Sequence, residues 1–262
     1  MSQYQENATV TRVEQLSSKN YRLTFDSPLI AGDCKPGQFV MIRTSIGKDP
    51  LLRRPFSVHQ VSGNGEIQVY FKEVGRGTSI LAHAKIGDVY SIFGPLGRGF
   101  KINTAGPSIL VGGGLGIAPL LLLLKETCRL KTNCENDLVI LGGRSRDEVE
   151  PLLDDFKQYG VTVRVSTDDG SLGHHGYVTE ILKSLDIATS STVYACGPEP
   201  MMASIAAICS EISVACQVSV ESVMACGMGA CLGCSRPDKK GSYTHVCLNG
   251  PVFDAEKLEW NI

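Results

Sequence analysis

The chain has 262 residues, of which 43% are hydrophobic and 20% charged, and its formal net charge is −2. This length and composition predict a soluble globular protein with two domains and room for a small appendix. The near-neutral charge gives no reason to expect a nucleic-acid or anionic-membrane partner. The N-terminal residues lack the basic and apolar regions of a secretory signal, and the apolar run 120–124 is too short to span a bilayer. We therefore expect a cytoplasmic protein with no membrane segment.

Residues 1–102 contain short segments in which apolar and polar residues alternate, separated by Ser-Pro, Lys-Pro-Gly and Gly-Asn-Gly turns. These segments predict strands at 9–14, 21–25, 38–43, 56–61, 66–72 and 88–93. Many short strands at this spacing are typical of a small antiparallel β-barrel. One short helix is expected at 78–84, with Thr78 near its N-terminal cap.

Residues 103–220 follow a different pattern, in which strands alternate with helices. Strands are predicted at 108–111, 138–141, 161–166, 192–195 and 214–220, and helices at 118–129, 177–185 and 199–209. This alternation predicts an α/β domain whose parallel sheet is covered by helices on both faces.

A glycine-rich loop directly follows the first strand of this second domain. Gly114 and Gly116 lie in it, and glycines let backbone N–H groups approach a pyrophosphate at the start of a helix. The loop departs from the Rossmann fingerprint, because Pro119 stands where the third glycine would be, so the usual acidic ribose ligand should not be assumed. A plain tight turn between strand and helix is the alternative.

Residues 221–262 carry four cysteines, three of them crowded in one loop. Cys226, Cys231 and Cys234, followed later by Cys247, give the spacing C-x₄-C-x₂-C…C of plant-type [2Fe–2S] ferredoxins. A structural zinc site and unliganded thiols are the alternatives. The segment has too few apolar residues for an independent core, so we expect the cluster to stabilise it. The other six cysteines are expected to be mainly small buried thiols of a reducing compartment: Cys34, Cys128, Cys134, Cys196, Cys209 and Cys216.

Four motifs occur in a fixed order along the chain: Arg54-Pro-Phe-Ser57, Gly75-Arg-Gly-Thr78, the loop from Gly114 to Pro119, and the segment from Cys196 to Met202. Together they resemble the ferredoxin-NADP reductase superfamily over residues 5–220. The resemblance implies an FAD-binding barrel at 1–102, an NAD-binding α/β domain at 103–220 and, beyond it, a small iron–sulfur appendix at 221–262.

The resemblance also implies roles for the first motif. Arg54 would pair with an FAD phosphate, Phe56 would lie against the isoalloxazine and Ser57 would face the reactive ring nitrogen, with Pro55 between them. Phe56 departs from the tyrosine common in the family, so stacking survives and a phenol hydrogen bond is lost. Arg53 is either a further cofactor contact or a solvated neighbour.

Other residues are expected to border the flavin or the nicotinamide. The amides of Gly77 and Thr78 offer a second phosphate cradle at a helix start. Tyr70, Phe71 and Lys72 end the strand that leads there. His59 is most simply a strand histidine. Cys196 and Glu221 are the candidate catalytic residues: by resemblance a cysteine at this place lies near the nicotinamide, and Glu221 faces the flavin or anchors the cysteine loop.

The choice between NAD and NADP stays open at this point. Arg144 and Arg146 follow the second strand of the α/β domain and suit a 2′-phosphate, but Asp147 and Glu148 adjoin them.

The segment 220–231 narrows the resemblance to the electron-transfer subunits of type B dihydroorotate dehydrogenase. This implies transfer of electrons between a dihydroorotate-oxidising FMN subunit and NAD through [2Fe–2S] and FAD, in pyrimidine biosynthesis, within a heterotetramer of two copies of each subunit. One alternative is an NAD(P)H-dependent reductase subunit of a hydrogenase or transhydrogenase, since related subunits share the layout. Another is a zinc-stapled nucleotide-binding regulator without redox function.

Overall fold

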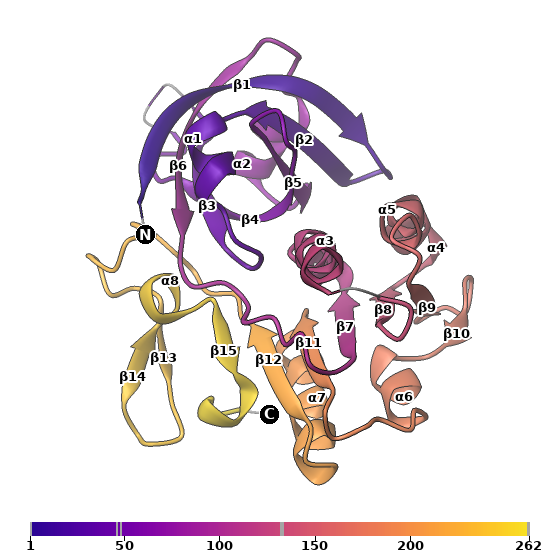
Figure 1. Cartoon of the computed structure of the whole chain (residues 1–262). Coiled ribbons are helices and arrows are strands. Elements are labelled where there is room, and N and C mark those ends of the chain that lie inside the picture. The colour runs from indigo at the N-terminus through magenta and orange to yellow at the C-terminus, as the bar shows by residue number, and fades with distance from the viewer. Residues whose placement is uncertain (1, 46, 48, 132–133, 261–262) are drawn as a thin grey trace.

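The computed structural model describes residues 2–45, 47, 49–131 and 134–260. Its N-terminal part is a closed antiparallel barrel with the strand order β1-β2-β5-β4-β3-β6 (Figure 1). The barrel strands are β1 (Tyr4–Gln15), β2 (Asn20–Asp26), β3 (Phe39–Arg43), β4 (Arg54–Val61), β5 (Glu66–Lys72) and β6 (Val89–Leu96), with helices α1 (Pro28–Asp33) and α2 (Arg76–Ala82). The predicted antiparallel barrel is confirmed, with every expected strand present and its ends moved by a few residues.

The barrel closes over a complete apolar core. Leu23, Val58 and Val69 come from three neighbouring strands, and none of their surface is exposed. The short helix α1 was not predicted, because Ser27-Pro28 favours a turn. The carboxylate of Glu6 on β1 holds this helix, since it accepts hydrogen bonds from the Ser27 hydroxyl at 2.6 Å and the Ile30 N–H at 3.0 Å.

The second part is a seven-stranded sheet with the order β10-β9-β8-β7-β11-β12-β15. Its strands are β7 (Ser108–Gly113), β8 (Leu138–Gly143), β9 (Thr162–Thr167), β10 (His174–His175), β11 (Thr192–Cys196), β12 (Ala215–Ser219) and β15 (Val252–Asp254). All neighbouring strands are parallel except β15, which pairs antiparallel with β12. The expected parallel sheet is thus confirmed, with an antiparallel edge strand from the C-terminal segment.

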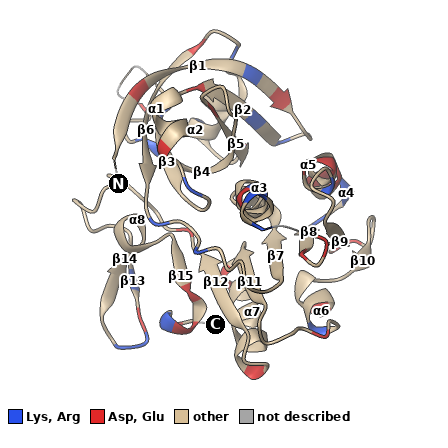
Figure 2. Cartoon of the chain, viewed as in Figure 1, with Lys and Arg blue, Asp and Glu red and all other residues tan. Residues whose placement is uncertain are grey.

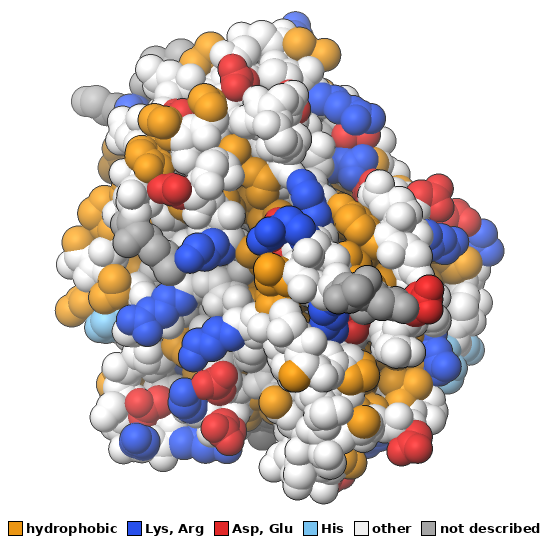
Figure 3. Space-filling view, in the orientation of Figure 1, with side chains coloured by type: hydrophobic (Ala, Val, Ile, Leu, Met, Phe, Trp, Pro, Cys, Tyr) orange, Lys and Arg blue, Asp and Glu red, His pale blue; other side chains and the backbone are white. Residues whose placement is uncertain are grey.

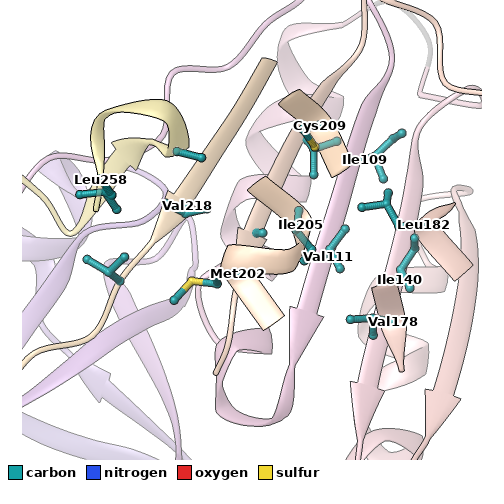
Figure 4. Close-up of a cluster of buried hydrophobic side chains, with 14 of the residues drawn as sticks. Ile109, Val111, Ile140, Val178, Leu182, Met202, Ile205, Cys209, Val218 and Leu258 are labelled. Atoms are coloured by element: carbon teal, nitrogen blue, oxygen red, sulfur yellow. The ribbon is translucent and has the colours of Figure 1, made fainter. Parts of the chain in front are cut away.

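Helices cover both faces of this sheet, as predicted. They are η1 (Gly114–Ile117), α3 (Leu120–Leu130), α4 (Arg146–Val149), η2 (Glu150–Leu152), α5 (Leu153–Lys157), α6 (Val178–Lys183) and α7 (Glu199–Glu211). On one face α6 and α7 supply Val178, Leu182 and Ile205 to a cluster that includes Val111 and Ile140 of the sheet (Figure 4). On the other face α3 and α5 pack against Leu110, Val139 and Leu141.

The apolar run 120–124 is explained by its place between two neighbours. All five leucines are buried, and Leu122 belongs to the barrel core while Leu121 belongs to the core of the sheet. The helix α3 therefore packs against both domains. Among the described residues no helix has both the length and the apolar content needed to cross a membrane.

Ionic and polar contacts also join the barrel to the α/β domain. Arg22 pairs with Asp155 at 2.5 Å, and Lys72 pairs with Glu148 at 2.7 Å. Basic and acidic residues are spread over the two domains (Figure 2). These contacts tie β2 and β5 of the barrel to α5 and α4 of the α/β domain.

The C-terminal segment contains short elements beside the barrel and the sheet (Figure 1). They are β13 (Ser235–Pro237), β14 (Tyr243–His245), α8 (Val246–Asn249), β15 and η3 (Ala255–Lys257). Its buried residues Val246, Cys247 and Leu258 join the same cluster as Val218 of β12. The segment, which was expected to lack an independent core, shares the core of the neighbouring domain.

Candidate functional site

A cleft of about 790 Å³ lies between the barrel and the carboxyl ends of the sheet strands. Open α/β sheets bind ligands at this edge. Its lining comes from turns 113–116, 142–144 and 197–202, from the barrel residues Asn20, Tyr70 and Lys72, and from Glu221 and Arg236 of the C-terminal segment. All three parts of the chain thus build one cleft.

The glycine-rich turn after β7 forms the floor of this cleft. Gly114 has a φ of +56°, in the left-handed region that favours glycine. Any side chain at Gly116 would collide with the backbone carbonyl of Cys196, so the absence of a Cβ lets the turn pack against the end of β11. Backbone N–H groups of such a turn suit a pyrophosphate. The turn therefore fits a dinucleotide.

A second polar site lies on the barrel around Arg54. The Arg54 side chain packs on Gly77, where a Cβ would come within 3.1 Å of Arg54 Cγ. Nη1 of Arg54 donates to the carbonyl of Leu52 at 2.7 Å, and no carboxylate pairs with this guanidinium in the described part of the chain. The hydroxyl of Thr44 is buried beside them and has no hydrogen-bond partner among the described residues. A guanidinium, a hydroxyl and first-turn amides together suit a phosphate.

Arg53 is not brought into this group and is not a solvated neighbour either. Its guanidinium turns toward β6, where it donates to the Ser91 carbonyl at 2.6 Å and the Ser91 hydroxyl at 3.0 Å. Burial and the charge of Arg43 lower the pKa of Arg53. Arg53 therefore ties β6 to the start of β4, while Arg54 keeps donors for a ligand.

Strand alternation separates the other barrel residues. Tyr70 and Lys72 line the cleft, whereas Phe71 is buried in the barrel core and meets Phe56 edge to face at 5.7 Å. Only 8% of Phe56 is exposed, so its ring lies under the barrel surface. Ser57 and Pro55 are half-buried on β4.

The helix α2 begins at Arg76, two residues before the predicted start. The hydroxyl of Thr78 is therefore inside the first turn, where it accepts the N–H groups of Val74 and Gly75 at 2.9 and 3.0 Å. Thr78 caps the helix with its side chain, and only its amide is left for a ligand.

Glu221 lines the cleft, and Cys196 is buried close enough for the charge of Glu221 to act on its thiol. Cys196 is buried at the end of β11. Burial and the charge of Glu221 raise the pKa of its thiol to about 12, although a hydrogen bond with Ser219 acts in the opposite direction. Glu221 keeps surface open to the cleft, but the protein packed around it raises its pKa. The structure thus holds a protonated thiol beside a carboxyl group of raised pKa.

The four predicted cluster ligands are in the C-terminal segment as two pairs. The sulfurs of Cys234 and Cys247 are 3.2 Å apart. Cys226 and Cys231 form the other pair. Burial raises the pKa of the Cys226 thiol, but hydrogen bonds lower it to about 6. These come from the Cys231 thiol and from the backbone N–H groups of Met228, Ala230 and Cys231. A [2Fe–2S] centre takes two thiolates on each iron, so two pairs are the distribution it needs. No three metal-binding side chains converge on one point in the described ranges.

The loop backbone turns its N–H groups toward these sulfurs. Gly229 donates to Cys247 Sγ at 3.1 Å, and Met228 donates to Cys226 Sγ at 3.5 Å. Gly227 has a φ of +72°, and a Cβ there would come within 2.6 Å of Met41 Cγ on the barrel. The loop therefore packs directly against strand β3 of the barrel. Such N–H groups stabilise cluster sulfurs, so the loop fits the cluster.

Three cleft or barrel residues were missed by sequence reasoning: Asn20, Thr44 and Arg236. Asn20 is 4% exposed, and its Oδ1 lacks a partner within the described structure. Each is a single polar residue without a motif, so only the folded arrangement reveals them.

Comparison with known proteins agrees with this three-part arrangement. Residues 7–100 match the oxidoreductase FAD-binding domain, and residues 110–207 match the oxidoreductase NAD-binding domain. Residues 221–259 match the iron–sulfur cluster binding domain of dihydroorotate dehydrogenase B. The chain therefore carries FAD, NAD and iron–sulfur domains, and the zinc-stapled alternative is not supported.

Solved structures share the fold. The structure of an NADH-dependent reduced ferredoxin-NADP oxidoreductase superposes with a TM-score of 0.87 at 29% identity, over 97% of this chain and 90% of that one. A ferredoxin reductase of carbazole 1,9a-dioxygenase has a TM-score of 0.66 at 22% identity, over 81% of this chain and 66% of that one.

Two curated relatives match nearly end to end. The dihydroorotate dehydrogenase B (NAD(+)) electron transfer subunit of Desulforamulus reducens is 40% identical, over 97% of this chain and 98% of the relative. The corresponding subunit of Fusobacterium nucleatum is 36% identical with the same coverage. The chain thus belongs to the family of dihydroorotate dehydrogenase B electron transfer subunits.

Proposed function

We propose that this chain passes electrons between NAD and a partner subunit that oxidises dihydroorotate at FMN, as a step of pyrimidine biosynthesis. The observation that carries the proposal is one chain that builds a dinucleotide cleft, a flavin barrel and a four-cysteine loop in mutual contact. Flavin supplies the required chemistry, because it exchanges a hydride with a nicotinamide and single electrons with an iron–sulfur cluster.

The cleft residues would bind and orient the dinucleotide. Gly114 and Gly116 provide the pyrophosphate turn, and Cys196 and Glu221 stand at the end where the nicotinamide is expected. Burial keeps the Cys196 thiol protonated, and the protein packed around Glu221 raises the pKa of its carboxyl group. These two residues are the proposed catalytic contacts.

The barrel residues would hold FAD. Arg54 and the amides of Gly77 and Thr78 suit its phosphates, because the site has spare donors and no side chain at Gly77. We propose that the rest of the wall borders the flavin, directly or by supporting it: Arg53, Pro55, Phe56, Ser57, Tyr70, Phe71 and Lys72. Of these, Tyr70 and Lys72 already face the cleft.

The proposed cluster ligands are Cys226, Cys231, Cys234 and Cys247. Their pairing and the N–H groups around them support a [2Fe–2S] centre. The proposed division of labour follows the segments 1–102 for FAD, 103–220 for NAD and 221–262 for the cluster.

The partner is expected to cover the cluster loop. Large apolar side chains are exposed around it: Val223 by 87%, Met228 by 49%, Leu232 by 54% and Leu248 by 51%. Hydrophobic side chains also gather along the left edge of the molecule, beside the position of α8 (Figure 3). Exposed apolar patches of this kind mark protein interfaces. We propose a heterotetramer of two copies of each subunit, in the cytoplasm, where the cysteines outside the cluster stay reduced.

A reconstitution experiment tests this function. The purified chain with FAD and cluster should reduce an artificial acceptor with NADH but should not oxidise dihydroorotate. Addition of the FMN-bearing subunit should create NAD⁺-dependent dihydroorotate oxidation. If the two proteins do not associate, the alternative reductase of a hydrogenase or transhydrogenase becomes the better assignment.

A further inference from the structure

We propose that Arg236 of the cluster segment is a further nucleotide-binding residue, whose guanidinium contacts an acceptor oxygen in the nicotinamide half of NAD. Arg236 lies on β13, two residues after the cluster ligand Cys234, yet its side chain lines the dinucleotide cleft. Arg236 thus joins Glu221 in bringing the cluster segment to the nucleotide site. The inference rests on the proposed function, in which NAD occupies this cleft.

The surroundings of Arg236 hold the guanidinium in one place. Nη2 donates to Glu199 Oε1 at 2.5 Å and to the carbonyl of Glu259 at 3.3 Å. The ring of Trp260 lies 5.2 Å from the guanidinium carbon, a cation–π contact. Glu199 is the first residue of α7, directly after the turn at Gly197 that lines the same cleft. The side chain is therefore preorganised at the mouth of the nucleotide site.

The guanidinium has donors to spare. A guanidinium carries five N–H donors, and here the bonds to protein involve only Nη2. Nε is buried and makes no hydrogen bond within the described part of the chain. Only 13% of the side chain is exposed, so water satisfies few of these donors. A bound ligand with an acceptor oxygen would satisfy what the protein leaves open.

The order of the strands indicates which half of the dinucleotide Arg236 meets. The pyrophosphate turn follows β7, and β8 and β11 lie on opposite sides of that strand. In this class of sheet the adenosine ribose is recognised after the second strand of the domain, here β8. The nicotinamide half then extends over β11, toward Glu199, Glu221 and Arg236. Ribose hydroxyls and the carboxamide oxygen are the acceptors available there.

A purely structural role for Arg236 makes a different prediction. If the side chain only ties the cluster segment to α7, its ion pair with Glu199 is the interaction that stabilises the protein. Glu199→Gln would then harm the protein as much as loss of Arg236. If the guanidinium contacts NAD, Glu199→Gln leaves it in place and also removes a negative charge beside an anionic ligand.

Binding of NAD⁺ and of AMP, measured by calorimetry on the FAD- and cluster-loaded protein, separates these roles. Arg236→Gln should weaken NAD⁺ binding about tenfold to hundredfold, the loss of a hydrogen bond to a charged group. AMP, which lacks the nicotinamide half, should bind as it does to the wild type. Arg236→Lys, which keeps the charge but not the fork, should fall between. Lys240→Ala removes a cation from the exposed β13–β14 turn and should change neither affinity.

Iron and FAD contents are measured on every variant to show that the sites remain intact. Arg236 binding NAD is contradicted if Arg236→Gln and Arg236→Lys bind NAD⁺ as tightly as the wild type. It is equally contradicted if Glu199→Gln matches the loss seen in Arg236→Gln. A wild-type protein that binds AMP but not NAD⁺ would overturn the proposed function along with this inference.

Discussion

The barrel and the cluster segment solve the same problem, holding a cofactor, in opposite ways. The barrel closes its hydrogen-bonded strands on themselves, and Leu23, Val58 and Val69 fill it without a ligand. The cluster segment has strands of three residues and places its buried side chains in the core of the neighbouring sheet. One region is thus complete before its cofactor binds, and the other depends on its neighbours and on its ligand.

This difference predicts which region loses structure when its cofactor is removed. Removing FAD contacts should leave the barrel folded, because its core does not include them. Removing cluster ligands should loosen the segment around them, because metal binding and local folding are coupled where a core is lacking.

The largest expected effect follows from breaking the cluster. Cys247→Ser should abolish the [2Fe–2S] absorbance and lower the iron content toward zero, because Cys247 pairs with Cys234 at 3.2 Å. Hydrogen exchange should rise in residues 222–250 and stay unchanged in the barrel. Cys128→Ser serves as the control, because Cys128 lies near the C-terminal end of α3 and outside the cluster segment. Full iron content in Cys247→Ser would remove Cys247 from the ligand set.

A second prediction concerns the joint between the barrel and the α/β domain. His59 is fully buried, with Nδ1 2.7 Å from the carbonyl of Ala118, and burial lowers its pKa from 6.5 to about 4. The unfolded chain binds the proton near pH 6.5 and the folded chain only near pH 4. Stability is therefore fully present above pH 6.5 and falls as the pH drops toward 4.

His59→Gln should remove this part of the acid sensitivity, on the order of 3 kcal/mol. Urea unfolding at several pH values, followed by circular dichroism, measures the difference between the two proteins. Equal slopes for wild type and variant between pH 6.5 and pH 4 would show that His59 does not carry the effect.

The two adjacent arginines give a third, smaller and sharper test. Arg54→Ala should weaken FAD binding by about 1.5–3 kcal/mol, more than tenfold, and leave the barrel folded. Arg53→Ala should do the reverse, because Arg53 donates to Ser91 across the barrel. It should destabilise the barrel by about 1–3 kcal/mol with little change in FAD affinity once folded. Equilibrium FAD titration and thermal unfolding of both variants measure the pair.

If Arg54→Ala keeps the wild-type FAD affinity at matched ionic strength, the phosphate site around Gly77 is misplaced. If Arg53→Ala loses FAD as strongly as Arg54→Ala, the separation of their roles is wrong.

Local sequence patterns predicted much of the fold. Alternation predicted the barrel strands, and the change to strand–helix alternation after residue 102 predicted the parallel sheet. The C-terminal strand β15 could not be predicted, because three residues show no period and their pairing with β12 arises only from the tertiary fold. The helices α4 and α5 were also missed, because Pro151 divides their sequence into pieces too short to recognise.

The candidate site was predictable where a motif carries it. The cysteine set and the glycine turn could be predicted because their members lie close together in the sequence: three of the cysteines share one loop, and Cys247 follows thirteen residues after Cys234. Sequence reasoning assigned Arg54 to the phosphate but left the role of Arg53 open. Only the fold shows that the Arg53 guanidinium turns toward Ser91 of β6. Arg236 was invisible for another reason: it belongs to the cluster segment by sequence and to the nucleotide cleft only by folding.

The most direct test of the whole account measures coupling rather than any single site. The wild-type chain, a cluster-free Cys234→Ser/Cys247→Ser variant and the FMN-bearing subunit are compared for NADH oxidation by an artificial acceptor and for dihydroorotate-driven NAD⁺ reduction. At saturating NADH, which offsets weaker binding through a loosened Arg236, we expect the variant to keep its NADH-to-acceptor activity. It should lose dihydroorotate-driven NAD⁺ reduction, because only that activity needs the cluster. A variant that lacks iron, still binds the FMN subunit and still reduces NAD⁺ with dihydroorotate would contradict the account.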